Sequence, residues 1–163
     1  MRSILHSISQ TLAKLALILS ALGLIAMTIT VSWQVFGRYV LNDSPNWSEP
    51  ITIQLMGWFI LLGSAVGIRE NYHLGFDVLR HVVPKPVARI MASISMLVVL
   101  VFAVAMAVYG MQLVVGTWTA TLPVLGWPGG TDFMPLVAGG ALMAFYAVEQ
   151  LYLIVTGAAD EVL

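Results

Sequence analysis

The sequence predicts an all-α integral membrane protein with four transmembrane helices, both termini cytoplasmic (N-in/C-in), and short interfacial amphipathic helices. Of its 163 residues, 60% are hydrophobic and 9% are charged, whereas a soluble domain carries about 25% charged residues. The uncharged runs are also long enough to cross a hydrocarbon core of about 30 Å as helices. A membrane protein is the only class that fits both observations.

The apolar runs divide the chain into four predicted spans within a single membrane domain, 1–163. Their approximate bounds are 14–38, 49–69, 87–117 and 133–157. The first run, residues 15–37, has 23 uncharged residues, too many for the apolar region of about 7–15 residues in a cleaved signal peptide. We therefore expect the first helix to be retained.

Local signals mark the ends of the later helices. Ser48-Glu49-Pro50 supplies a capping hydroxyl, a carboxylate at the positive end of the helix dipole and a proline in the first turn. The uncharged run 90–131 is broken by prolines and glycines from Pro123 to Gly130, so the third helix should end near residue 117. Pro135 suits the first turn of the last helix.

The basic residues predict the orientation. Six precede the first span or lie around the middle loop: Arg2, Lys14, Arg69, Arg80, Lys85 and Arg89. Only Arg38 falls on the other side of the membrane. Because Lys and Arg accumulate in cytoplasmic loops, both termini should be cytoplasmic. Residues 1–11 fit either a short interfacial amphipathic helix or a frayed terminus, and a second amphipathic stretch covers residues 77–83.

Several classes of function are excluded by what the sequence lacks. There is no cysteine, which removes disulfides, thiolate chemistry and iron–sulfur ligation. The three histidines, His6, His73 and His81, lie outside the apolar runs, so none can ligate a haem within the helices. No Walker motif, internal repeat or intramembrane acidic cluster is present. We expect no enzymatic activity, no cofactor or metal in this chain, and no nucleic-acid partner.

Apart from charged residues at or near the ends of the predicted spans, Glu149 is the one charged residue inside them. A charge at that depth costs several kcal/mol unless it is paired or hydrated, which makes it either a proton or cation relay or a carboxylate satisfied by a basic neighbour. A relay needs a second acidic or histidine group, and none is nearby in the sequence. The satisfied carboxylate is the better interpretation, with Lys14 and then Arg89 as expected partners.

Other candidate contacts come from small and polar residues. Small residues at helical spacing predict close helix packing, within the chain or against another subunit; with Glu149, the candidates are Gly63, Gly67, Ala103, Ala107, Gly140 and Ala144. Candidates for outer ion pairs or for docking of a soluble partner are Arg38, Asp43, Trp47, Glu49 and Trp127. Candidate cytoplasmic interfacial residues are Arg69, His73, Asp77, Arg80, Lys85 and Arg89. Gln34 and Gln54 should hydrogen-bond between helices.

The order of these landmarks resembles the small membrane subunit, the four-helix Q-type component, of the tripartite ATP-independent periplasmic (TRAP) transporters of bacteria. The resemblance rests on Arg38-Tyr39-Val40, Trp47-Ser48-Glu49, Trp58, Gly63-Ser64-Ala65, Arg69, His73-Leu74, Asp77, Pro84, Leu122-Pro123, Trp127 and Pro135. It covers nearly the whole chain. Pro50 departs from the family pattern, which often has a second acidic residue or a leucine-type residue there, so a paired carboxylate is not expected at Glu49.

The resemblance implies a location, partners and a role. The chain would be a multi-pass protein of the bacterial inner membrane, surrounded by phospholipid. A large multi-span subunit would bind the solute and the sodium ions, and a soluble periplasmic protein would deliver an organic acid, either a carboxylate or a sialic-acid-like solute. This chain would be a non-catalytic scaffold of that sodium symport system, with residues 40–49 and 118–132 as candidate docking loops.

Two other functions compete with the scaffold hypothesis. The first is a small homodimeric four-helix exporter that uses Glu149 as its coupling carboxylate; such exporters place an acidic residue within their first helix, and the first span here has none. The second is a quinone-linked membrane anchor, which the absence of an intramembrane histidine disfavours. The scaffold remains the preferred hypothesis.

Overall fold

The structure is a computed structural model that describes residues 2–70 and 84–156. Helix α1 (Arg2–Phe36) continues into a π-helical turn, η1 (Gly37–Leu41), and is followed by α2 (Ser48–Arg69). Helix α4 (Lys85–Thr117) leads through a loop to the 3₁₀ turn η2 (Gly129–Phe133) and to α5 (Met134–Thr156). Four of these helices are long and apolar enough to cross a membrane, which confirms the predicted all-α membrane class.

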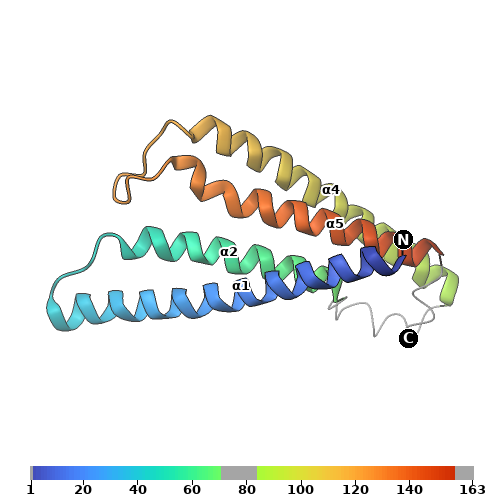
Figure 1. Cartoon of the computed structure of the whole chain (residues 1–163), viewed down its shortest axis with the longest axis horizontal. Coiled ribbons are helices and arrows are strands. Elements are labelled where there is room, and N and C mark those ends of the chain that lie inside the picture. Colours follow the sequence, from blue (N-terminus) through green and yellow to red (C-terminus); the bar gives the residue numbers. More distant parts are fainter. Residues whose placement is uncertain (1, 71–83, 157–163) are drawn as a thin grey trace.

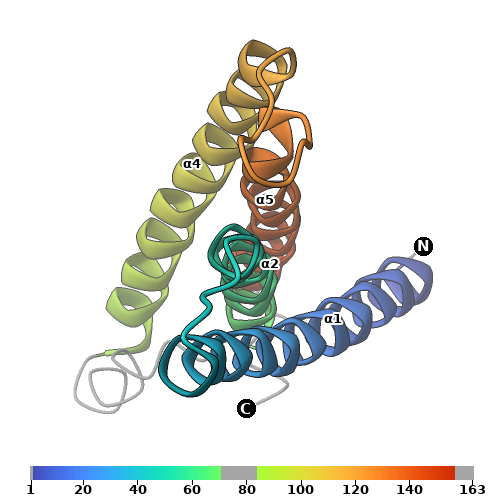
Figure 2. The ribbon, with the colours of Figure 1, turned by 90° about the vertical axis from the view of Figure 1, so that its left-hand side faces the viewer.

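The four long helices lie in the spatial order α1, α2, α5, α4. Helix α1 packs along α2, α2 along α5, and α5 along α4. Both views place α1 and α4 on the flanks, running obliquely to α2 (Figures 1 and 2). The two flanking helices therefore carry much of the outward surface, while α2 and α5 form the centre.

Helix lengths agree with this arrangement. Helices α2 and α5 have 22 and 23 residues, which at about 1.5 Å per residue matches a hydrocarbon core of about 30 Å. Helices α1 and α4 have 35 and 33 residues, considerably more than a perpendicular span requires. Their oblique course accommodates the extra length.

The N-terminal segment differs from the prediction. Residues 2–11 are neither a separate interfacial helix nor a frayed end, because they form the first turns of α1. Ser9, Ala13, Ala16 and Ser20 are buried at spacings of four, three and four residues, so one narrow face of small side chains faces the other helices. Contacts that begin at Ser9 explain why the helix is continuous there. The second predicted amphipathic stretch, 77–83, lies outside the described residues.

Close packing of α4 on α5 depends on small residues. A Cβ added at Gly140 would lie 2.8 Å from the backbone nitrogen of Ala107 and 2.9 Å from the carbonyl oxygen of Ala103. Ala103 is itself fully buried. In a membrane, van der Waals contact between closely approaching helices supplies much of the association energy. Ala103 belongs to a buried apolar cluster that also includes Ala65 of α2, Met96 of α4 and Tyr146 of α5.

Two loops, one between η1 and α2 and one between α4 and η2, form the end of the molecule that the orientation predicts to be periplasmic. In the first, Asn42 adopts a left-handed conformation and Asp43 N donates to Gly37 O at 3.0 Å. In the second, Leu122 N donates to Trp127 O at 2.8 Å, around a turn with Gly126 at φ +67°. Gln54 Nε2 of α2 donates to Thr131 O of η2 at 2.8 Å, which confirms the prediction for Gln54. This bond joins two helix hairpins, α1–α2 and α4–α5. Within the described residues Gln34 forms no such hydrogen bond.

Candidate functional site

Polar side chains from three helices meet near the cytoplasmic end of the predicted spans. We call this group the Arg69 cluster; it comprises Ser9, Arg69, Glu70, Glu149 and Gln150. Ser9 Oγ donates a hydrogen bond to Glu149 Oε2 and accepts one from Arg69 Nε at 3.0 Å. Arg69 Nη1 forms an ion pair with Glu70 Oε1 at 2.7 Å, and Gln150 Nε2 donates to Arg69 O at 2.6 Å. The cluster thereby joins α1, α2 and α5.

The Arg69 cluster explains how an intramembrane carboxylate is tolerated. Ser9 is fully buried and the Arg69 side chain is 13% exposed, so the two hydrogen bonds of Ser9 form largely out of water, whereas the Glu70 side chain is 44% exposed. A serine hydroxyl both donates and accepts. Ser9 uses both functions, so its hydroxyl bridges the Arg69 guanidinium and the Glu149 carboxylate. The arrangement resembles the satisfied carboxylate predicted from sequence more than a relay with a free acidic group.

The partner of Glu149 was not the one expected. Lys14 is exposed, and within the described chain it forms no ion pair with Glu149. Ser9 and Arg69 occupy that role because the oblique course of α1 brings its Ser9 turn to α5 (Figure 1). Arg89 lies on an exposed position of α4.

Tyr146 adds an unusual feature beside the cluster. The residue is fully buried, and its hydroxyl has no hydrogen-bond partner among the described residues. The phenol lies about one turn before Glu149 on α5. A buried hydroxyl without a partner is costly, so this side of the cluster is less completely satisfied than the Ser9 side.

The predicted small-residue contacts occur largely within the chain. Gly63 faces Ser20 of α1, with an added Cβ only 3.0 Å from Ser20 Oγ. Ala103, Ala107 and Gly140 form the α4–α5 contact described above, and Ala144 packs against the buried core. Gly67 is different, because an added Cβ there would meet nothing within 4 Å. It borders an apolar groove of about 580 Å³ between α2, α4 and α5.

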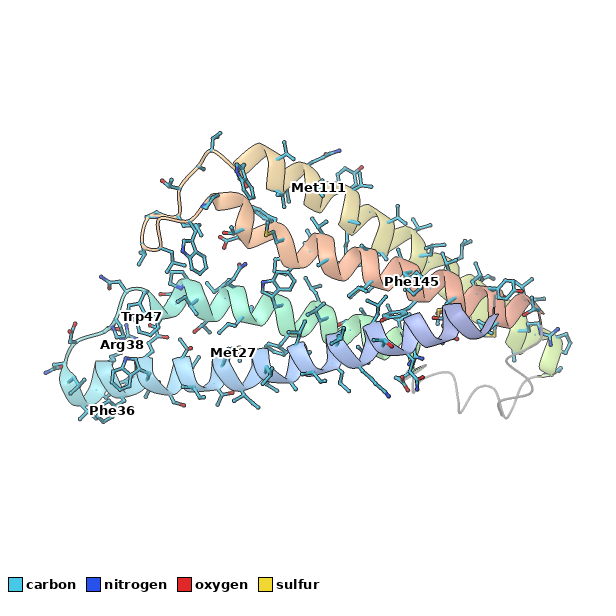
Figure 3. All side chains as sticks on the ribbon, in the orientation of Figure 1. Met27, Phe36, Arg38, Trp47, Met111 and Phe145 are labelled. Carbon is cyan, nitrogen blue, oxygen red and sulfur yellow. The ribbon has the colours of Figure 1, made fainter. Side chains whose placement is uncertain are left out.

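A polar cavity lies at the opposite end of the helices, between the two hairpins. We call it the outer cavity. It has a volume of about 560 Å³, and its lining residues are Gln34, Arg38, Ser44, Pro45, Asn46, Glu49, Pro50, Ile53, Val124 and Asp132. Arg38 and Trp47 are both seen at this end, beside the connection from α1 to α2 (Figure 3). Arg38 and Glu49, which the sequence suggested as an outer ion pair or docking site, both line this cavity, and they are joined by Asp132, which the sequence gave no reason to include.

The expected outer ion pair is not formed. Within residues 2–70 and 84–156, Arg38, Asp43 and Glu49 make no side-chain ion pair, and Asp43 does not line the cavity. Trp47 and Trp127 are 42% and 46% exposed, as befits aromatic residues at a membrane–water interface. Of the cytoplasmic candidates, His73, Asp77 and Arg80 lie outside the described residues, and Lys85 begins α4.

Sequence reasoning missed Ser9 and Tyr146. Ser9 lies in residues 1–11, for which the sequence left an interfacial helix and a frayed terminus as alternatives, and only its spacing from Ala13, Ala16 and Ser20 indicates a packing face. Tyr146 precedes Glu149 by three residues, which places both on neighbouring positions of one helix face. In the described part of the chain, no group of three or more metal-ligating side chains comes together.

Comparison with known proteins identifies similar sequences. The family model described as "Tripartite ATP-independent periplasmic transporters, DctQ component" matches residues 27–157. The C4-dicarboxylate TRAP transporter small permease protein DctQ of Vibrio cholerae is 27% identical over 100 residues, covering 61% of this chain and 40% of that protein. The protein of the same name from Pseudomonas aeruginosa is 34% identical over 90 residues, covering 55% of this chain and 40% of that protein.

A third relative is matched over more of its length. The sialic acid TRAP transporter small permease protein SiaQ of Vibrio cholerae is 28% identical over 128 residues, covering 78% of this chain and 73% of that protein. The match thus spans about two fifths of the C4-dicarboxylate relatives and almost three quarters of the sialic acid relative.

Proposed function

Because the chain belongs to the DctQ components of the tripartite ATP-independent periplasmic transporters, we propose that it is the non-catalytic scaffold subunit of a sodium-coupled organic-acid transporter. The chain is a transport component of the bacterial inner membrane, crosses the membrane several times and is not an enzyme. In the proposed complex, a large multi-span subunit holds the solute and the sodium ions. A soluble periplasmic protein delivers the solute to it.

The observation that carries the scaffold role is the Arg69 cluster. A coupling carboxylate must exchange its proton or ion during transport, and Glu149 is instead engaged by Ser9, with Arg69 behind it. Among the described residues, the other carboxylate of the cluster, Glu70, is ion-paired with Arg69. This engagement of Glu149 favours the scaffold role over the alternative, a self-contained homodimeric exporter that uses Glu149.

The surface of the flanking helices supports assembly with a larger partner. Large apolar side chains project outward from both flanks, among them Leu15, Leu17 and Ile18 of α1 and Val101, Phe102 and Val108 of α4, with exposed fractions of 50% or more. Such surfaces suit phospholipid and other membrane helices. The names of the relatives support an organic acid, of the C4-dicarboxylate or sialic acid type, as the solute.

Reconstitution into proteoliposomes tests this function. With the large subunit, the soluble protein and a sodium gradient, the chain should support uptake of a radiolabelled organic acid, because the solute site lies on the partner. The chain alone should give no uptake and no efflux above empty liposomes. Solute movement catalysed by this chain alone would contradict the scaffold role.

The proposed orientation places both termini in the cytoplasm, on the basis of six basic residues against one. A reporter that is active only in the periplasm should therefore be inactive when fused after Gly75. The same reporter fused within the loop after Thr117 should be active and provides the matched control. The reversed pattern of activities would show that the orientation is wrong.

A further inference from the structure

The outer cavity has walls from both halves of the molecule. Gln34, Arg38 and Glu49 come from α1, η1 and α2, whereas Val124 and Asp132 come from the connection between α4 and α5. Gln54 of α2 donates to the carbonyl of Thr131, directly beside Asp132. The cavity therefore exists only because the two hairpins are held in their observed relative position.

Internal hydrogen bonds fix the backbone of these walls. Ser48 is fully buried, and its hydroxyl donates to Pro45 O at 2.7 Å. Gly37 is tightly enclosed, since an added Cβ would lie 2.8 Å from Asp43 O. On the other wall, Gly129 N donates to Ala120 O at 2.6 Å. A partner that enters such a cavity loses little free energy to ordering of the loops, which favours binding.

Unlike the backbone of these walls, the charged side chains around the cavity are not held by hydrogen bonds among the described residues. In the described part of the chain, Arg38, Glu49 and Asp132 form no side-chain hydrogen bond or ion pair. At the other end of the helices, the Arg69 cluster joins its charged groups to one another. The outer end thus presents charges on a rigid frame with no partner inside the described chain.

The balance of these charges indicates which group fits. Two carboxylates, Glu49 and Asp132, face one guanidinium, Arg38, so the lining carries a formal charge of −1. We propose that the outer cavity receives a basic side chain, lysine or arginine, from the soluble periplasmic binding protein, with Glu49 and Asp132 as its acceptors. This inference rests on the proposed function. Because the two carboxylates belong to different hairpins, the incoming cation would contact both halves of the scaffold at once.

Charge reversal in the assembled complex tests the inference. The chain and its large subunit are placed in phospholipid nanodiscs, and binding of the soluble protein is measured at low and high salt. We expect the double variant Glu49→Lys/Asp132→Lys to weaken binding about tenfold or more at low salt, with a smaller effect at high salt, because opposed charges at an interface are repulsive and screened by ions.

The matched control uses two acidic residues of the C-terminal segment, which the predicted orientation places in the cytoplasm. Asp160→Lys/Glu161→Lys makes the same change in net charge and should change the affinity by less than about threefold. Retention of the large subunit during purification shows that each variant is assembled. An equal loss for the control pair would mean that net charge, not the cavity, determines binding, and would overturn the inference.

Two further outcomes separate this inference from the proposed function. Unchanged affinity of the cavity variant, together with loss of a bound phosphatidylethanolamine detected by native mass spectrometry, would assign the cavity to a lipid headgroup and overturn the inference alone. Absence of any binding of the soluble protein to the wild-type complex would overturn both the proposed docking function and the inference that rests on it.

Discussion

Replacing Gly140 by alanine is expected to separate helices α4 and α5 and to lower the free energy of unfolding by about 2 kcal/mol, the range of an overpacked core. The added Cβ would lie 2.8 Å from the Ala107 backbone nitrogen and 2.9 Å from the Ala103 carbonyl oxygen. Backbone atoms cannot rotate away as a flexible side chain can, so the helices must move. The measurement is the unfolding midpoint of the detergent-solubilised chain.

Gly116 on α4 provides the matched control. An alanine Cβ there meets nothing within 4 Å, and alanine favours a helix over glycine by about 1 kcal/mol. Gly116→Ala should therefore leave the unfolding midpoint unchanged or raise it. Equal destabilisation by the two substitutions would show that the close α4–α5 contact at Gly140 is not what holds these helices together.

Replacing Arg69 by alanine is the second change with a large expected effect, a loss of about 2–3 kcal/mol of stability. The substitution removes the donor to Ser9 and the ion pair with Glu70, and it leaves the Glu149 carboxylate without the nearby guanidinium. An uncompensated buried charge costs several kcal/mol, and the partial exposure of Glu149 reduces this amount. Thermal unfolding in detergent measures the loss.

Two comparisons isolate the origin of that loss. Lys14→Ala removes an exposed basic residue of α1 and should change stability by less than about 0.5 kcal/mol. Arg69→Ala combined with Glu149→Gln should recover part of the stability, since the amide removes the unpaired charge while still accepting from Ser9. A double variant as unstable as Arg69→Ala would show that Arg69 does not compensate Glu149.

The spans could be predicted from sequence because the bilayer imposes a simple rule. Hydrocarbon excludes charge over a fixed thickness, so the uncharged runs mark the helices, and prolines and glycines mark their ends. For α2, the predicted bounds 49–69 agree with Ser48–Arg69 within one residue. The start of α1 was missed because polar residues before Lys14 looked interfacial, although Ser9 packs between helices.

The order of the helices and the polar contacts could not be predicted in the same way. The spans are apolar on every side, so hydrophobicity does not indicate which face meets which neighbour. Ser9 and Glu149 are 140 residues apart in sequence, and nothing local to either residue identifies the other. Likewise, Asp132 joins Glu49 at the outer cavity only through the packing of two hairpins. In both cases the site depends on tertiary contacts alone.

Uptake by the Glu149→Gln complex, normalised to the amount of assembled complex, tests most directly whether this chain is a scaffold. The account predicts that the variant assembles less efficiently, because the Arg69 cluster is weakened. Each assembled complex should nevertheless transport solute at close to the wild-type rate and with unchanged dependence on the sodium gradient. Full assembly with loss of sodium-dependent uptake would contradict the account and make Glu149 a coupling residue.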